Sequence, residues 1–407
     1  MKQTGAQLLQ SQVRVAILTT SYPLTSDSSS GIFVARLVEN LPEFVTSVVI
    51  TPASRTSEQP SQSRRVAIRQ FRYAPRKLQL LAHEPGGIPA SLRRRRWIYL
   101  LLPGFLASMF ISCLMHARNA DVIHANWAIC GCIAGLVGKL LRLPVVTTLR
   151  GDDVTRAHRH FLDRLILSLC MRYSTAVVAV SYAIGTTIRQ QYPDQAHKVC
   201  TIQNGINDAF LNLQPRSEQH PLRLLTVGSL IPRKGVDRII RAVHLLSQPG
   251  RVSLLIVGDG PERGSLEDLA YRLNLQDDIE FSGALPPSAV PAALAQANVF
   301  ILASASEGRP NALVEAMAAA VPVIASDIPG VKELVTDGRT GLLFPAESID
   351  RLTECIRTML DDPDVRIRLG RAAREFVVSQ QVTWGTSAER YCRAYQSALK
   401  QNRSCAE

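Results

Sequence analysis

The feature that most constrains the fold is the regular alternation of short apolar runs, rich in β-branched residues, with longer amphipathic stretches. Each short run has the length and composition of a buried strand, and each longer stretch has the spacing of a helix. Strands that alternate with helices in this way form parallel sheets with crossover helices. The predicted strands are Val13–Thr19, Val45–Thr51, Val66–Arg72, Asp121–Ala125, Val145–Leu149, Ala176–Val180, Val199–Gln203, Leu222–Val227, Val252–Val257, Ile279–Phe281, Val299–Ala303, Pro322–Ala325 and Gly341–Phe344.

The alternation is interrupted by a polar segment with two prolines, which we interpret as a linker over residues 208–221. A chain of 407 residues is long enough for two domains with a core each. We therefore predict an α/β protein with two Rossmann-like domains, 1–207 and 222–384, that face each other across a cleft. A last amphipathic helix within residues 385–407 is expected to cross back onto the first domain.

Cysteine usage and the start of the chain indicate a cytoplasmic protein. The eight cysteines are scattered, and only Cys130 and Cys132 lie close together, which is neither a zinc spacing nor a disulfide framework. The apolar run Val13–Thr20 is too short for a signal peptide and leads into a Ser-rich loop. We expect reduced thiols and a first strand.

One apolar segment and one basic segment point to a membrane surface. Trp97–Met115 has nineteen residues without a charge, but Pro103-Gly104 interrupts it, so we expect a helix buried against the sheet or lying at a membrane. Residues 64–118 carry eleven Arg and Lys and one acid, Glu84, within a chain of net charge +12. A basic cluster beside an apolar segment favours an anionic membrane surface. No nucleic acid is expected, because no binding motif accompanies the charge; a merely solvated basic face is the alternative.

Loops at strand ends carry the candidate phosphate chemistry. Gly228 opens a loop in which Arg233 and Lys234 precede a helix, and cations beside a helix N-terminus suit a diphosphate. Gly258 opens the loop Gly-Asp-Gly-Pro-Glu, whose glycines either admit a nucleotide or simply make the turn. Gly31 follows the first strand at the corner where such domains bind phosphate or an acceptor.

Two acids eight residues apart follow a buried strand. Glu307 and Gly308 lie in a short loop, Pro310 is predicted to begin a helix, and Glu315 falls on the flank of that helix. Carboxylates accept hydrogen bonds from sugar hydroxyls, so with the cations they indicate a nucleotide-sugar site. Taken alone, the pair is more typical of solvated structural acids.

These motifs together resemble the retaining glycosyltransferases of family 4, which have the GT-B fold. The resemblance covers nearly the whole chain and rests on Glu307-Gly-Arg-Pro-Asn with Glu315, on Gly228 with Arg233-Lys-Gly, and on Gly258-Asp-Gly-Pro-Glu, Pro322-Val-Ile-Ala and Asn204-Gly205. The Glu-x7-Glu spacing is the hallmark of that family. The resemblance implies transfer of a hexose from a UDP- or GDP-linked sugar to a lipid-linked or polysaccharide acceptor, with retention and without a metal or other cofactor.

The resemblance also implies roles for individual residues. Glu315 would bind the ribose, and Glu307 with the backbone of Gly308–Asn311 would hold the donor sugar. Lys234, helped by Arg233, would neutralise the departing diphosphate. Asp362-Pro-Asp364 looks like a metal motif, but its position at the start of a helix favours a cap.

Three positions depart from the family pattern. Ser229 stands where Arg often follows the glycine, Ala320 where glycine is usual, and Arg150 where a histidine often meets the donor sugar. Arg150 stays a catalytic candidate, although an arginine is a permanent donor with a longer reach.

The acceptor-side candidates are His124, Asp152 and Asp153. His124 is equally well interpreted as a structural histidine, and Asp153 as a helix cap. The rival functions are an epimerase or phosphorylase on the same two-domain scaffold, or a membrane- or nucleic-acid-binding module driven by charge.

Overall fold

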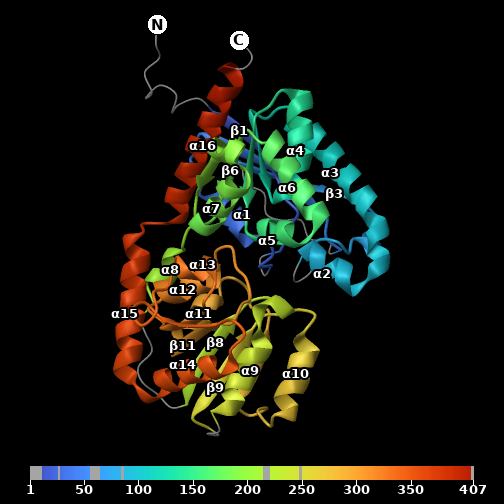
Figure 1. Cartoon of the computed structure of the whole chain (residues 1–407). Helices are drawn as coiled ribbons and strands as arrows, with labels where there is room; N and C mark the ends of the chain where they lie inside the picture. Colours follow the sequence, from blue (N-terminus) through green and yellow to red (C-terminus); the bar gives the residue numbers. More distant parts are fainter. Residues whose placement is uncertain are drawn as a thin grey trace. The chain divides into compact units, whose positions relative to one another are not determined.

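The computed structural model describes residues 12–25, 28–55, 65–83, 87–213, 221–246 and 250–404. The chain divides into two compact units (Figure 1). Unit 1 contains residues 1–203 and 384–407, and unit 2 contains residues 204–383. The thirteen predicted strands are all present, with boundaries shifted by two residues or fewer.

Unit 1 is built on a seven-stranded parallel sheet of order β3-β2-β1-β4-β5-β6-β7. Its strands are β1 (Val13–Leu18), β2 (Val45–Pro52), β3 (Val66–Phe71), β4 (Val122–Asn126), β5 (Val145–Leu149), β6 (Ala176–Ala179) and β7 (Val199–Thr201). Its helices are α1 (Ile32–Glu39), α2 (Gly87–Arg94), α3 (Leu102–Ala117), α4 (Ala128–Leu141), α5 (Asp152–Arg159), α6 (Phe161–Tyr173), α7 (Tyr182–Gln191) and α16 (Trp384–Ser404), with the 3-10 turns η2 (Arg76–Leu78), η3 (Arg96–Leu101) and η4 (Pro193–Lys198).

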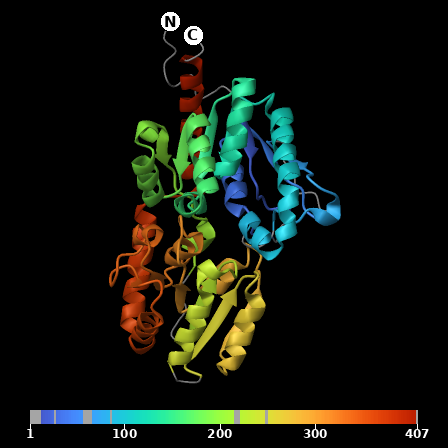
Figure 2. The ribbon, with the colours of Figure 1, turned by 45° about the vertical axis from the view of Figure 1, so that its right-hand side comes forward.

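The period of two along each strand divides the core of unit 1 between the two faces of the sheet. In β1, Val15 and Ile17 pack with α1 and α16, whereas Ala16 and Leu18 pack with α3 and α4. Figure 2 shows helices covering the sheet from both sides. Because both faces are covered, the strands are apolar almost throughout, as the sequence predicts.

The last helix belongs to unit 1, as predicted for the GT-B fold. α16 contributes Trp384, Ala388, Tyr391 and Tyr395 to the core that also contains β1 and α1. Residues at the end of the chain therefore complete a domain whose sheet begins at residue 13.

Unit 2 is built on a six-stranded parallel sheet of order β10-β9-β8-β11-β12-β13. Its strands are β8 (Leu222–Val227), β9 (Val252–Val257), β10 (Ile279–Gly283), β11 (Val299–Leu302), β12 (Val323–Ser326) and β13 (Leu342–Phe344). Its helices are α8 (Asp208–Leu211), α9 (Val236–Leu245), α10 (Arg263–Arg272), α11 (Val290–Ala295), α12 (Asn311–Ala318), α13 (Pro329–Lys332), α14 (Ile349–Asp361) and α15 (Pro363–Ser379), with the 3-10 turn η5 (Pro232–Lys234).

The segment predicted as a linker contains structure of its own. α8 lies in it, and Phe210 is buried in the core of unit 2. Residues 214–220 of that segment lie outside the described residues. The chain passes between the units at Gln203–Asn204 and again at Thr383–Trp384.

Two further sequence predictions are confirmed by local geometry. Asp362 caps α15, because its carboxylate accepts a hydrogen bond from the Val365 backbone N–H at 3.0 Å. The apolar segment forms η3 and α3, and α3 buries Phe105 and Met109 against the sheet. The seven cysteines that the structure describes are free thiols.

Candidate active site

The loop after β11 is held by residues from the loop after β8. These strands are neighbours in the sheet, so their carboxyl ends lie side by side. The Arg233 carbonyl accepts from the Ala305 N–H at 2.8 Å, and Arg233 Nη1 donates to the Ser306 carbonyl at 3.0 Å. Lys234 Nζ donates to Glu307 Oε1 at 2.6 Å. The fold thus brings together the two cations and the first glutamate that the sequence singled out.

Lys234 and Glu307 form an ion pair whose side chains are 20% and 9% exposed. Burial alone would raise the pKa of Glu307, but the charges of Lys234 and Arg233 and the Lys234 hydrogen bond outweigh it, so the pKa is lowered. Glu307 is therefore a carboxylate at neutral pH. Glu307 and Lys234 were predicted to contact different parts of a donor, and here they contact each other.

Arg238 supports this arrangement from α9, although no sequence pattern singled it out. Its guanidinium donates from Nη2 to the Ala303 carbonyl at 2.8 Å and from Nη1 to the Ala346 carbonyl at 2.6 Å. It also forms an ion pair with Glu347 at 3.1 Å. Arg238 thereby fixes the end of β11 just before the Glu307 loop. Its one sequence signal is an arginine on the buried face of an amphipathic helix.

The helix that carries Glu315 begins one residue later than predicted. Pro310 is the N-cap with ψ 101° and α12 begins at Asn311, because the extended backbone of Pro310 lies outside helical geometry. Glu315 is half-buried on the second turn. Asn204 Nδ2 donates to Asn311 Oδ1 at 3.1 Å, which ties the Asn204-Gly205 turn to the start of this helix.

Gly330 is a second residue that the sequence did not reveal. The start of α13 lies against the backbone of Glu307 and Gly308, and a Cβ at position 330 would collide with both carbonyls. Gly308 is itself buried in this contact. A Pro-Gly pair just after β12 was the available signal, since such a pair marks a tight turn.

Close packing between two loops accounts for the glycine of the loop after β9. Gly258 has φ 147°, and a Cβ there would overlap the carbonyl of Gly228. A small pocket lies beside this contact. It is lined by Thr226, Val227, Gly228, Leu230, Lys234, Val236, Val257 and Leu302. Lys234 therefore borders both the pocket and Glu307.

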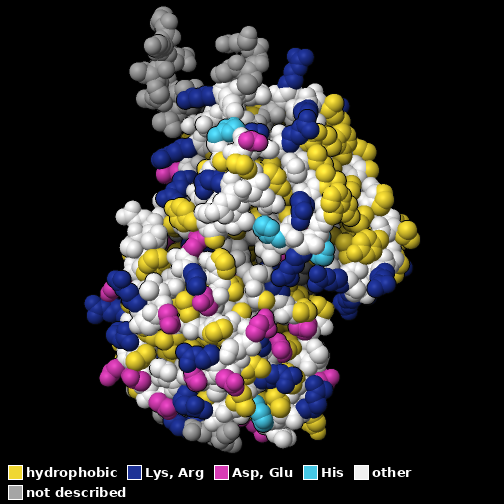
Figure 3. Space-filling model, in the orientation of Figure 1, with side chains coloured by type: hydrophobic (Ala, Val, Ile, Leu, Met, Phe, Trp, Pro, Cys, Tyr) yellow, Lys and Arg dark blue, Asp and Glu magenta, His cyan; other side chains and the backbone are white. Residues whose placement is uncertain are grey.

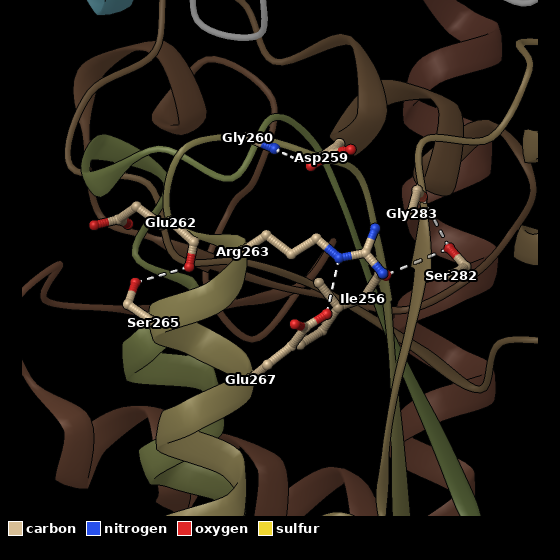
Figure 4. A network of polar contacts seen from close by, with 9 residues as sticks. All are labelled: Ile256, Asp259, Gly260, Glu262, Arg263, Ser265, Glu267, Ser282 and Gly283. Carbon is tan, nitrogen blue, oxygen red and sulfur yellow. Dashed lines mark hydrogen bonds and ion pairs between the residues drawn. The ribbon is translucent and has the colours of Figure 1, made fainter. Parts of the chain in front are cut away.

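Arg263 places another cation at the carboxyl ends of the strands. Figure 4 shows its side chain extending from the start of α10 towards Gly283 at the end of β10. Arg263 Nε donates to Glu267 Oε1 at 2.8 Å, and Ser282 Oγ donates to the Ile256 and Gly283 carbonyls. No sequence pattern singled out Arg263 or Ser282.

The candidate site of unit 1 centres on Arg150, after β5. Arg150 Nη2 donates to Asn126 Oδ1 at 2.6 Å, and the guanidinium lies 3.8 Å from the centre of the Phe33 ring and 5.8 Å from that of Trp127. Burial lowers the pKa of Arg150 to about 10, against opposing effects of Tyr391 and Asp153, so the side chain remains charged. Asn126, which the sequence analysis missed, is fully buried at the end of β4.

Asp152 and Asp153 form the first turn of α5. Gly151, with φ 109°, is the N-cap of this helix, so the prediction that Asp153 caps it is wrong. Asp153 Oδ2 instead accepts from the Arg150 backbone N–H at 3.3 Å. Burial raises the pKa of Asp153 to about 7, although the bond from Arg150 opposes this effect. Asp153 thus titrates near neutral pH beside Arg150.

The prediction that His124 contacts the acceptor is wrong. It lies within β4 at 0% exposure, on the face covered by α16. Its Nε2 bonds to Thr148 Oγ1 at 2.8 Å and its Nδ1 to Tyr395 Oη at 2.8 Å, so neither ring nitrogen is left for an acceptor. Burial and the Arg150 charge lower the pKa of His124 to about 3. The structural interpretation of this histidine is correct.

Gly31 serves the packing of the loop after β1. It is the N-cap of α1 with φ 71°, and a Cβ there would collide with the Ser21 carbonyl. Within the described residues, no group of three or more His, Cys, Asp or Glu is arranged to hold a metal ion.

Two parallel-sheet domains of this kind define a class of protein. The structure of HepE from Anabaena in complex with UDP and glucose matches with a TM-score of 0.74 at 21% identity, over 95% of this chain and 100% of that one. The protein therefore has the GT-B fold.

Sequence comparison identifies the family. "Glycosyltransferase Family 4" matches residues 30–210 and "Glycosyl transferases group 1" matches residues 212–376. Glycogen synthase of Mycobacterium tuberculosis is 30% identical over 295 residues, which are 70% of each chain. A GDP-mannose-dependent alpha-(1-6)-phosphatidylinositol monomannoside mannosyltransferase of that organism is 33% identical over 173 residues, 40% of this chain and 45% of that one. The chain belongs to the group 1, family 4 glycosyltransferases, and it is a hexosyltransferase.

Proposed function

We propose that this enzyme moves a hexose from a UDP- or GDP-linked donor to a lipid-linked or polysaccharide acceptor, with retention of configuration. The observation that carries the proposal is the Lys234–Glu307 pair beside Arg233, which sets a cation for phosphate next to an acceptor for sugar hydroxyls. The relatives support the range of substrates by their names: a UDP and glucose complex, a GDP-mannose-dependent enzyme acting on a phosphatidylinositol mannoside, and a glycogen synthase.

In the proposed reaction the donor diphosphate draws Lys234 away from Glu307, and the freed carboxylate accepts hydrogen bonds from the sugar. The bond between the anomeric carbon and the phosphate oxygen breaks, and the acceptor oxygen bonds that carbon on the same face. The acceptor proton passes to the departing phosphate oxygen, so no protein base is required. Lys234 and Arg233 stabilise the charge that develops on the diphosphate, and no metal is proposed.

The family resemblance gives Glu315 to the ribose and leaves the acceptor to unit 1. There Arg150, Asp152 and Asp153 lie at the carboxyl edge of the sheet. We propose that the protein is cytoplasmic and peripheral to the inner face of a membrane, with residues 64–118 facing anionic lipid. The excess of Arg and Lys in that segment supports this location.

Purified protein incubated with a panel of UDP- and GDP-hexoses tests the proposal by release of free nucleotide, with methyl glycosides as acceptors. Turnover is expected with one donor, with the anomeric configuration retained in the product by NMR. Absence of turnover together with absence of binding for every donor would contradict the proposal. An epimerase would instead interconvert sugar nucleotides without any acceptor, and a phosphorylase would form sugar 1-phosphate only from a glycan with added inorganic phosphate.

A second measurement distinguishes the proposed roles of Glu307 and Glu315. Glu315→Ala is expected to weaken binding of UDP or GDP about tenfold or more in calorimetry, because a charged hydrogen bond to the ribose is lost. Glu307→Ala is expected mainly to slow transfer. Equal nucleotide affinity of Glu315→Ala and wild type would remove the ribose role.

A further inference from the structure

Helix α3 is apolar on both sides, although only one side is buried. Phe105, Met109 and Cys113, four residues apart, pack against the sheet of unit 1. The opposite side presents Ile111 and Met115, which are exposed. The continuous stretch Arg96–Ala117 is apolar and long enough to span a membrane by length and composition, yet only 28% of its most apolar window is buried. A surface helix that is apolar all round requires a cover.

The exposed apolar surface continues onto neighbouring elements. Leu100 on η3 is 81% exposed and Leu140 on α4 is 64% exposed. Phe161 at the start of α6 is 74% exposed. Of the sixteen large apolar side chains that are exposed among the described residues, ten lie on η3, α3, α4 and α6. Figure 3 shows hydrophobic side chains gathered over the region of α3 and α4. We call this surface the apolar face.

Cations without acids border the apolar face. Arg93–Arg96 lie at the end of α2 and the start of η3, and Lys139 lies on α4 beside Leu140. The segments α2, η3, α3 and α4 contain no Asp or Glu. In α6 the carboxylate of Asp163 is bound by Arg156 at 3.1 Å. The border therefore carries net positive charge.

The topology places the basic end of this surface near the candidate acceptor residues. α2 and η3 follow the carboxyl end of β3, and Arg150 with Asp153 follows the carboxyl end of β5 in the same parallel sheet. All parallel strands end at one edge, so both groups lie at that edge of unit 1. A lipid-linked acceptor held at this edge would have its lipid part at the same edge of unit 1 as Arg93–Arg96.

We propose that the apolar face docks on the anionic leaflet of a lipid bilayer, with α3 lying along the membrane and not across it. Arg93–Arg96 contact lipid phosphates, and Leu100, Ile111 and Met115 enter the boundary between headgroups and acyl chains. This inference deepens the proposed membrane partner and rests on it. A transmembrane α3 is excluded by its packing on β1 and β2, which membrane insertion would remove.

The charge of the apolar face favours a bilayer over a second copy of the chain as its partner. A twofold dimer uses the same patch on both copies, so the arginines of one copy would meet a surface whose one carboxylate, that of Asp163, is already bound by Arg156. Burying four cations without partners is unfavourable. An anionic leaflet supplies phosphates for all four.

Flotation of the full chain with vesicles tests the proposal. The vesicles contain either phosphatidylcholine alone or phosphatidylcholine with about 30 mol% phosphatidylglycerol. The anionic lipid of the second kind attracts basic segments electrostatically. Wild type is expected to bind the anionic vesicles at least about tenfold more tightly than the neutral ones. Arg93→Gln, Arg94→Gln, Arg95→Gln and Arg96→Gln combined are expected to lose at least about tenfold of that affinity. The matched control changes four exposed arginines of unit 2 to Gln (Arg241, Arg272, Arg357 and Arg371), which lowers the net charge equally.

The apolar part is tested by Ile111→Gln with Met115→Gln, with Ile367→Gln and Val378→Gln as the matched control. The first pair is expected to reduce binding to anionic vesicles about tenfold, and the control pair to leave it unchanged. Equal binding by all variants, or equal binding to both kinds of vesicle, would overturn the proposal. A wild-type dimer in sedimentation that Ile111→Gln with Met115→Gln converts to a monomer would assign the face to a second copy. Donor turnover with soluble acceptors is measured in parallel without vesicles, so loss of the docking inference leaves the proposed chemistry testable on its own.

Discussion

The candidate donor loops of unit 2 and the candidate acceptor edge of unit 1 are assembled in different ways. In unit 2, Arg233 and Lys234 meet Glu307 through backbone and side-chain bonds between two neighbouring strand-end loops. In unit 1, Arg150 is placed by Asn126 and by the ring of Phe33, from separate elements. The residues of the first site lie within short sequence motifs. The residues of the second site lie on separate elements that only the tertiary fold brings together.

The difference extends to the layer behind each site. Behind the donor loops, Arg238 bonds two carbonyls at strand ends. Behind the acceptor edge lies a buried chain of hydrogen bonds from Tyr395 through His124 to Thr148, and from Thr148 to Tyr391. Both tyrosines come from α16, more than 240 residues after β5. Substitutions in the two regions should therefore fail in different ways, through activity in unit 2 and through stability in unit 1.

The largest expected effect belongs to the donor loops. Lys234→Ala removes the cation proposed for the diphosphate and leaves Glu307 without its partner, so kcat/KM is expected to fall by about 10³-fold. Steady-state release of nucleotide measures it. The control is Lys332→Ala, which breaks an exposed pair with Asp327 and should leave activity within about twofold. Retention of a tenth of the activity by Lys234→Ala would remove Lys234 from the chemistry.

The buried layer behind the acceptor edge should respond chiefly in stability. His124→Phe removes both hydrogen bonds of the imidazole and leaves the Tyr395 hydroxyl buried without its partner, so the free energy of unfolding should fall by about 2–3 kcal/mol. Urea denaturation measures this loss. His197→Phe, at an exposed position, is the control. A loss of activity without a loss of stability would return His124 to the acceptor side.

The same histidine gives a pH dependence with a defined sign. Its pKa in the folded state is about 3, below the value of about 6.5 expected in the unfolded chain. The unfolded state therefore binds the proton first, and the stability contributed at neutral pH is lost as the pH falls below about 6.5. Thermal melts at pH 7.5 and 5.0 should differ less in His124→Phe than in wild type. Burial also lowers the pKa of His83, so part of the acid sensitivity will remain.

A smaller effect on kcat is expected for Arg238 of unit 2, which positions the Glu307 loop and does not bind the donor. Arg238→Met is expected to lower kcat about tenfold with little change in the KM for the donor, because the Glu307 loop loses its anchor at Ala303 while the binding groups remain. Arg241→Met, on the exposed side of the same helix, is the control. Arg238→Lys should restore part of kcat. An unchanged kcat combined with a lower Tm would make Arg238 purely structural.

The smallest effect concerns the end of α12. Ala320 has φ 57°, in the left-handed region where the family usually has glycine. A residue with a Cβ in this conformation destabilises the folded state by about 1–2 kcal/mol. Glycine removes that strain, but its greater backbone freedom stabilises the unfolded chain and offsets part of the gain. Ala320→Gly should therefore stabilise the protein by about 0.5–1 kcal/mol in urea denaturation. Unchanged or lower stability would show that the left-handed backbone at this position is not strained.

The sequence by itself determined the architecture and the donor motifs. Strand positions follow from apolar runs bounded by turn residues, and the Glu-x7-Glu spacing with the Arg-Lys loop lies within short stretches. Such features are local, because hydrogen-bond periodicity and turn chemistry act over a few residues. Even here the sequence missed Gly330, whose need for a hydrogen side chain arises from a backbone more than twenty residues away.

Only the tertiary structure decided what surrounds those motifs. His124 was predicted as an acceptor contact, but its ring bonds to Tyr395 of α16. Arg150 contacts residues of α1 and β4. α3 has the composition of a buried or membrane-spanning helix, and packing alone shows which of its sides is covered. Contacts between residues far apart in the chain leave little periodic trace in a single sequence, because each partner satisfies local rules equally well with or without the other.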